Sequence, residues 1–413
     1  LHPDRSPYWL YAASNIGSFL GLLAYPFLIE PRLGLDRQFT LWAALFTLTA
    51  GGLVALSLHV RRSGSTGGGP NAIATPPDDA SVPHRLDLAL WLTLPACTSA
   101  LLLAATNELC QDLAVFPFLW VLPLAAYLLS FSLAFRTRPI RNQFPLAAVV
   151  TLIALSTTRA SLLLPAPVHV VSIGALIFVL CTAAHRELYR LRPPAPRLTA
   201  YYLWIAAGSG LGAAVVALLA PALFRGFWEF QGAVLALWAA MILAAATDPE
   251  GSMRRGDRRQ TAVLLALALY MALNRIPDEW LRRHLAGWVD IGWSALLRAA
   301  AAAAATAALW PAIKRRRAGL SVLWPRLLAG LMLFLAESSL VKRVRDDLSG
   351  SGFAARNFFG VVRIQEVLHP ATGIQVRQLT HGRINHGWQY LNPDLRALPT
   401  AYHSPSTGIG RLI

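Results

Sequence analysis

The chain has 413 residues, of which 55% are hydrophobic and only 14% are charged, and its mean hydropathy is +0.47. Soluble domains carry about 25% charged residues, so this composition argues against an ordinary soluble protein. A net charge of +16 would suit nucleic-acid binding in a soluble chain. Here the arginines gather in short segments between apolar stretches, as the positive-inside rule predicts for cytoplasmic loops. We therefore expect a lipid bilayer as partner and no nucleic acid.

Apolar stretches long enough to cross a membrane recur as far as residue 340. A crossing helix needs about 20 apolar residues, and the stretches lack the alternation of barrel strands. The predicted fold class is mainly α, a multi-pass transmembrane helical bundle with a small C-terminal antiparallel β module. The predicted spans are residues 8–29, 39–60, 87–106, 113–135, 144–164, 168–184, 200–224, 228–247, 261–275, 288–311 and 319–340.

Composition divides the chain into four parts. Residues 1–60 are predicted to form two transmembrane helices, and residues 61–86, rich in Gly, Ser and Pro, a flexible linker. Residues 87–350 form the main transmembrane bundle. Residues 351–413 form a β-hairpin module of different texture, rich in His, Arg and aromatic residues.

The last part contains short segments in which apolar and polar residues alternate. Residues 361–368 and 374–379 show this pattern around a turn signal at 369–373, and a third strand is predicted over 383–391. A sheet this small needs a surface that covers one face. We expect the final residues of the chain not to supply that cover.

Basic residues fall on every second connection between the predicted spans, which indicates the cytoplasmic side. Strict alternation would place the β module on the opposite side. The run Lys342-Arg-Val-Arg345, just before the module, instead favours the cytoplasm, which we take as the expectation. The basic connections contain Arg61, Arg62, Arg136, Arg138, Arg141, Arg186, Arg190, Arg192, Arg197, Arg254, Arg255, Arg258, Arg259 and Lys314 to Arg317.

A polar cluster interrupts the apolar pattern between two predicted spans. It contains Glu108 and Asp112, and Arg159 lies near the end of another span. Ionisable groups at membrane depth are costly and usually functional. These three residues are therefore a candidate intramembrane polar site, while the alternative is a short turn whose acids meet water.

Glycines four residues apart predict close contacts between helices. Gly208 and Gly212 show this spacing, and so do Gly17 and Gly21. The pattern around Gly208 does not follow a strand and lacks the spacing of a dinucleotide-binding loop.

The histidines and cysteines do not indicate a metal site or a disulfide framework. His381 and His386 are five positions apart, which on a single strand would point them to opposite faces. The three cysteines, Cys97, Cys110 and Cys181, lie in or beside predicted spans and are interpreted as packing residues.

Several stretches, in order along nearly the whole chain, carry a family resemblance. They are Pro7-Tyr-Trp-Leu-Tyr-Ala-Ala-Ser-Asn-Ile-Gly-Ser-Phe19, Thr106-Asn-Glu-Leu-Cys-Gln-Asp112, His185-Arg-Glu-Leu188, Arg356-Asn-Phe-Phe-Gly-Val-Val-Arg363, Leu379-Thr-His-Gly-Arg-Ile-Asn-His-Gly387 and Pro399-Thr-Ala-Tyr-His403. Together they resemble bacterial membrane proteins that fuse a transporter-like helical region to a spermidine synthase-like domain.

The resemblance implies a polyamine aminopropyltransferase of the bacterial inner membrane, with decarboxylated S-adenosylmethionine as cofactor. A ligand-contacting Gln of the family falls on Asn385, and its Tyr-His-Glu motif falls on Tyr402 and His403, with Ser404 in place of the Glu. The family's carboxylate motifs and cofactor loop would follow Ile413. No catalytic residue and no cofactor site is therefore assigned within these residues, and the chain alone is expected to be inactive.

Two further interpretations stay open. The protein is alternatively a membrane transporter or sensor, with the β module as a docking piece, or a purely structural anchor for an enzyme. Polar groups that face a central cavity near Glu108 would favour transport. A homo-oligomer is compatible with each interpretation.

Overall fold

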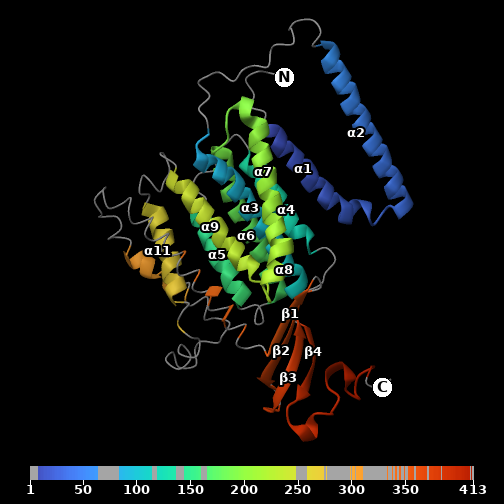
Figure 1. Cartoon of the computed structure of the whole chain (residues 1–413), viewed down its shortest axis with the longest axis vertical. Helices are drawn as coiled ribbons and strands as arrows, with labels where there is room; N and C mark the ends of the chain where they lie inside the picture. Colours follow the sequence, from blue (N-terminus) through green and yellow to red (C-terminus); the bar gives the residue numbers. More distant parts are fainter. Residues whose placement is uncertain are drawn as a thin grey trace.

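The computed structural model consists of a bundle of long helices with a four-stranded sheet at one end (Figure 1). It describes residues 8–63, 83–113, 119–135, 144–159, 165–247, 258–273, 352–357, 360–369, 372–382, 384–409 and 411, with isolated positions and short runs between 276 and 348. The helices are α1 (Tyr8–Ala24), α2 (Leu35–Ser63), α3 (Arg85–Asn107), α4 (Val121–Ala134), α5 (Phe144–Arg159), α6 (Ala166–Arg190), α7 (Leu198–Ala214), α8 (Ala220–Leu223), α9 (Glu229–Thr247) and α11 (Arg258–Leu273). Short π-helical turns extend α1, α3 and α7, and the one after α3 is η3 (Glu108–Leu113).

Within the described residues, five helices are long and apolar enough to cross a membrane, and the protein is accordingly a multi-pass membrane protein. They are Leu10–Ile29, Leu35–Arg62, Arg85–Cys110, Ala166–Arg190 and Leu198–Leu223. The predictions for residues 8–29 and 200–224 agree closely with these bounds. The helix predicted over 168–184 is longer, and α4 begins at Val121 rather than near residue 113. Most of the spans predicted at 288–311 and 319–340 lie outside the described residues.

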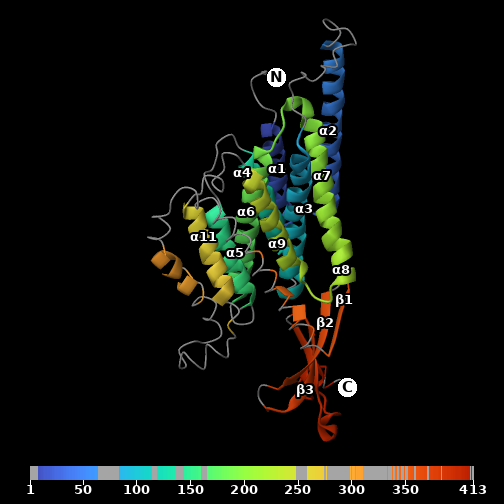
Figure 2. The same cartoon turned by 60° about the vertical axis from the view of Figure 1, so that its left-hand side comes forward.

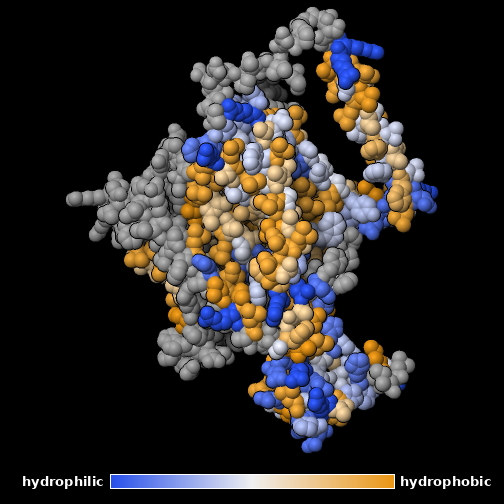
Figure 3. Space-filling model, in the orientation of Figure 1, coloured by the Kyte–Doolittle hydropathy of each residue, from blue (hydrophilic) through white to orange (hydrophobic). Residues whose placement is uncertain are grey.

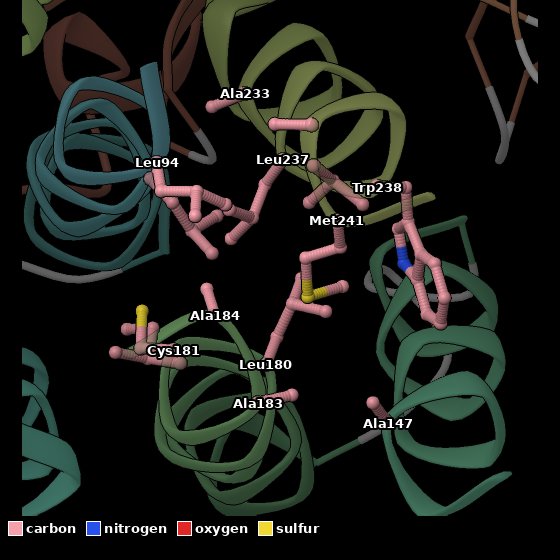
Figure 4. Close-up of a cluster of buried hydrophobic side chains, with 14 of the residues drawn as sticks. Leu94, Ala147, Leu180, Cys181, Ala183, Ala184, Ala233, Leu237, Trp238 and Met241 are labelled. Carbon is pink, nitrogen blue, oxygen red and sulfur yellow. The ribbon is translucent and has the colours of Figure 1, made fainter. Parts of the chain in front are cut away.

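Helix α3 lies at the centre of the bundle and packs against α4, α6, α7 and α9 (Figure 2). Leu94 of α3, Leu180 of α6 and Leu237 of α9 point toward one another in the core (Figure 4). Trp238 also donates a hydrogen bond from Nε1 to Thr151 Oγ1 at 3.1 Å, which joins α9 to α5. Helix α1 packs on α4, whereas α2 lies apart with almost every side chain exposed.

The α3–α7 contact confirms one glycine prediction. A Cβ atom on Gly208 would collide with the Leu92 carbonyl oxygen, and one on Gly212 with the Ala96 carbonyl oxygen. The backbones of the two helices therefore touch at these glycines, as small residues allow in membranes. The same prediction is wrong for Gly17 and Gly21 within the described part of the chain, where no atom lies within 4 Å of a Cβ built on either.

The sheet is an antiparallel meander in the order β1-β2-β3-β4. Its strands are β1 (Phe353–Asn357), β2 (Gly360–Leu368), β3 (Gln375–His381) and β4 (Ile384–Tyr390). The turn predicted at 369–373 is present, and it ends on Gly373 with φ +67, a conformation that glycine adopts without strain.

The sheet has one more strand than the sequence predicted, because β1 is short and its sequence barely alternates. The expectation that the last residues do not cover one face of the sheet stays a prediction, because these residues contact β4 while Leu379 and Ile384 remain 38% and 51% exposed. Thr400 hydrogen-bonds to Trp388 of β4, and the Tyr402 hydroxyl donates to the Asn385 carbonyl at 2.9 Å. The segment after β4 therefore folds back on the sheet, which is more hydrophilic than the helices above it (Figure 3).

Candidate functional site at the junction of helices and sheet

The sheet is attached to the bundle through a buried ion pair between β1 and the first residue of α9. Arg356 Nη2 lies 2.6 Å from Glu229 Oε1, and Nη1 lies 2.8 Å from Glu229 Oε2. The two side chains are only 3% and 4% exposed. A bidentate guanidinium–carboxylate pair is both strong and specific in geometry. Glu229 also sits in the first turn of α9, where the helix dipole favours a negative charge.

The loop before α9 completes the binding site for Arg356. Its Nη1 donates a second hydrogen bond, to the Gly226 carbonyl at 2.8 Å, and its guanidinium lies 4.6 Å from the centre of the Phe227 ring. A Cβ on Gly226 would come within 2.9 Å of Trp228 Nε1 and 3.3 Å of Arg363 Nη2. The loop therefore fits closely around the arginine, and only glycine leaves room at position 226.

More polar groups are buried at the same end of the bundle. Glu108, where α3 passes into η3, is 3% exposed, and η3 lies against β2. Gln231, two residues into α9, is 8% exposed, and neither amide atom has a hydrogen-bond partner among the described residues. Buried polar groups normally have hydrogen-bond partners, so the Gln231 amide is an unusual feature of this end of the bundle.

Of the three residues predicted as an intramembrane site, Glu108 is buried. The backbone of Asp112 lies in η3, and that of Arg159 ends α5. The side chains of both lie outside the described part of the chain, so the predicted grouping stays a prediction.

The structure brings together two of the three residues assigned by resemblance. Tyr402 donates its hydroxyl hydrogen bond to the backbone carbonyl of Asn385. The Asn385 side chain accepts from the Gly387 amide at 2.9 Å, which supports the local turn of β4. His403 is exposed in a short 3-10 helix.

His381 and His386 lie closer together than predicted. Their ring centroids are 5.9 Å apart with an interplanar angle of 27°. The single-strand argument fails because the turn at Gly382 places the two histidines on adjacent strands. Among the described residues there is no group of three metal-ligating side chains.

A second buried polar group lies between α4 and α6, near the end of α6. His185 is 1% exposed, its Nδ1 lies 3.0 Å from Ser130 Oγ, and its ring stacks on Phe131 with centroids 3.6 Å apart. Ser130 also donates to the Tyr127 carbonyl at 2.6 Å. Because a hydroxyl has one proton, this network assigns the proton to Nδ1 and leaves Nε2 as an acceptor. Nε2 has no hydrogen-bond partner among the described residues.

Sequence reasoning missed Glu229, Arg356 and His185. The signal that could have found Glu229 is a charged residue beside an apolar stretch, but nothing in one sequence indicates its partner. Chemically, the Glu229 carboxylate is fully engaged by Arg356, so the pair serves attachment rather than proton transfer.

These features define the class of protein: a multi-pass membrane protein whose helical bundle carries a docked antiparallel sheet. No protein-family model, curated protein or solved structure matches the chain.

Proposed function

We propose that the helical bundle is a membrane-embedded platform that holds the sheet in a fixed orientation, in a protein of the spermidine synthase-like kind from a bacterial inner membrane. The buried Arg356–Glu229 pair is the observation that carries the platform role. Burying two opposite charges costs desolvation free energy unless their geometry is fixed. A flexibly tethered module would therefore not keep this pair buried against the helices.

A distance measurement tests the platform. The native cysteines are replaced, and spin labels are attached to Asp394→Cys in the sheet module and Arg192→Cys at the end of the bundle opposite the sheet. In nanodiscs the two labels should give one narrow distance distribution. Arg356→Gln should broaden it. Arg377→Gln, in the exposed pair with Glu366, is the matched control and should leave the distribution narrow. A broad distribution before any change at Arg356 would refute the platform.

Aminopropyl transfer is the activity that the resemblance implies for the spermidine synthase-like kind of protein. Between residues 351 and 413 the acidic residues are Glu366, which pairs with Arg377, and Asp394, so this segment offers no cluster of free carboxylates for a cationic polyamine. We expect no turnover when the purified chain is incubated with putrescine and decarboxylated S-adenosylmethionine. Turnover above a protein-free control would contradict this expectation.

Transport is the second candidate, and the buried polar groups of the bundle favour it. Glu108 and His185 are both ionisable and almost fully buried, and such residues inside membrane proteins often line ion paths. Proteoliposomes under an imposed pH gradient should then pass protons faster than protein-free vesicles. Glu108→Gln should remove the excess flux, while Glu366→Gln on the sheet should not. Equal flux with and without protein would exclude proton transport.

A further inference from the structure

Hydrogen bonds between helix ends define which of these ends lie together, far from the sheet. Trp91, near the start of α3, donates from Nε1 to the Leu191 carbonyl at 2.9 Å, just after α6 ends. Arg190 Nη2 donates to the Ala244 carbonyl at 2.9 Å, near the end of α9. The start of α3 therefore lies with the ends of α6 and α9.

Two further contacts extend this set. The rings of Phe135, after α4, and Tyr189 of α6 are 5.2 Å apart. Helix α7 runs parallel to α3, because Gly208 meets Leu92 and Gly212 meets Ala96. The end of α4 and the start of α7 thus belong to the same end of the bundle, opposite the sheet (Figures 1 and 2).

The sheet lies at the other end. The first residue of α9 binds β1 through Arg356, and η3, which follows α3, lies against β2. Helix α3 has 23 residues, a length of about 34 Å at 1.5 Å per residue. This length matches the hydrocarbon thickness of about 30 Å, so the two ends face opposite sides of the membrane.

Positive charge is divided unevenly between these two ends. The end far from the sheet collects most of the arginines in the connections between helices. The sheet end has fewer: α5 ends on Arg159, Arg225 lies in the connection before α9, and the sequence after α11 contains Arg275, Arg282 and Arg283, while η3 contains Glu108 and Asp112. Among the described residues, the arginines at the end far from the sheet are Arg85, Arg186, Arg190, Arg192 and Arg197, and α11 begins with Arg258 and Arg259. The sequence that follows α4 and α9 adds Arg136, Arg138, Arg141, Arg254 and Arg255.

We infer that the arginine-rich end faces the cytoplasm and that the sheet faces the extracytoplasmic side. The positive-inside rule counts Lys and Arg in short loops near the ends of spans, and the arginines of the far end outnumber those of the sheet end even when the run at Lys342–Arg345 is added to the latter. This inference rests on the proposed platform. It follows strict alternation of the spans across the membrane and replaces the cytoplasmic side that the sequence led us to expect for the β module.

The inference changes which ligands are available to the sheet. Decarboxylated S-adenosylmethionine is a charged sulfonium made by cytoplasmic chemistry, and a charge does not cross a lipid bilayer unaided. A sheet on the far side would meet that cofactor only after export. Any ligand or partner of the sheet would then be one that is present outside the cytoplasm.

Cysteine accessibility tests directly which side of the membrane the sheet faces. In the full chain with Cys97, Cys110 and Cys181 replaced by Ala, the reporters are the exposed positions Asp394→Cys in the sheet module and Arg192→Cys at the arginine-rich end. Intact bacteria are treated with a membrane-impermeant maleimide before and after permeabilisation. We expect labelling of Asp394→Cys in intact cells and of Arg192→Cys only after permeabilisation. The reverse pattern, or labelling of both positions in intact cells, would overturn the inference.

Protease protection keeps the test decisive if the cysteine-free chain fails to fold. In right-side-out spheroplasts carrying the unmodified protein, external trypsin should cleave after Arg396 and Arg411, which are exposed and lie outside the strands. Protection of these sites until lysis would overturn the inference. Failure here is distinct from failure of the platform, because the spin-label distance does not depend on which side the sheet faces.

Discussion

The buried Arg356–Glu229 pair predicts a large loss of docking when only one partner is removed. Arg356→Met deletes two hydrogen bonds to the carboxylate and one to the Gly226 carbonyl, and leaves the Glu229 carboxylate buried. Hydrogen bonds to a charged group contribute about 1.5–3 kcal/mol each, and loss of one partner of a buried pair costs about 3–5 kcal/mol. We therefore expect Arg356→Met to destabilise the docked sheet by about 3–5 kcal/mol.

Native-state hydrogen exchange of the β1 and β2 amides measures this change, because it reports the free energy of local opening. The matched control is Arg377→Met. Arg377 and Glu366 form a contact of similar length, 2.8 Å, but their side chains are 45% and 55% exposed. Such surface pairs contribute about 0–1 kcal/mol, so the control should change exchange little.

The double variant Arg356→Met/Glu229→Met separates the pair from its surroundings. Replacing both partners of a buried pair by apolar residues is often neutral, so the double variant should dock better than Arg356→Met alone. Equal losses of docking free energy for Arg356→Met and Arg377→Met would refute the reasoning. So would a double variant whose loss equals the sum of the losses of Arg356→Met and Glu229→Met.

Three other substitutions test the helix contacts and the sheet. Gly212→Ala places a methyl group on the Ala96 carbonyl and should destabilise the bundle by about 1–3 kcal/mol in thermal unfolding. Gly210→Ala, in the same helix but with nothing within 4 Å, should be neutral or stabilising, and equal melting temperatures would contradict the α3–α7 contact. Tyr201→Phe removes a buried hydrogen bond of 2.7 Å to the Leu188 carbonyl and should cost about 1 kcal/mol, whereas Tyr25→Phe, whose bond to Gln38 is exposed, should leave the melting temperature unchanged. Gly360→Ala should increase exchange in β2, because Gly360 has φ +132 and a Cβ there would collide with the His381 ring; Gly352→Ala is the control, and identical exchange would contradict the prediction.

The helical bundle could be predicted because composition alone determines which stretches lipid can solvate. Helix contacts could be predicted only in part. Gly208 and Gly212 have the same spacing as Gly17 and Gly21, yet only the first pair touches another helix. Spacing identifies a face that could pack closely, but the position of the neighbouring helix decides whether it does.

The junction could not be predicted from one sequence. Glu229 and Arg356 are 127 positions apart, and many other arginines were available as partners for the glutamate. The contact between His381 and His386 was missed for a local reason, because the turn between them moves the second histidine to the next strand. Long-range pairing and turn geometry both depend on the folded chain.

The side of the membrane bears on both proposed functions. The platform proposal holds for an extracytoplasmic sheet, because docking through Arg356 does not depend on the orientation in the membrane. This orientation does, however, separate the sheet from the cytoplasmic cofactor that the resemblance implies. It also gives the buried polar groups a physical context. Glu108 lies at the sheet end of α3, whereas His185 lies near the arginine-rich end of α6, only five residues before Arg190. Ionisable groups inside a membrane bundle often mark ion paths, so an extracytoplasmic sheet is compatible with the transport candidate, which the proton-flux measurement tests.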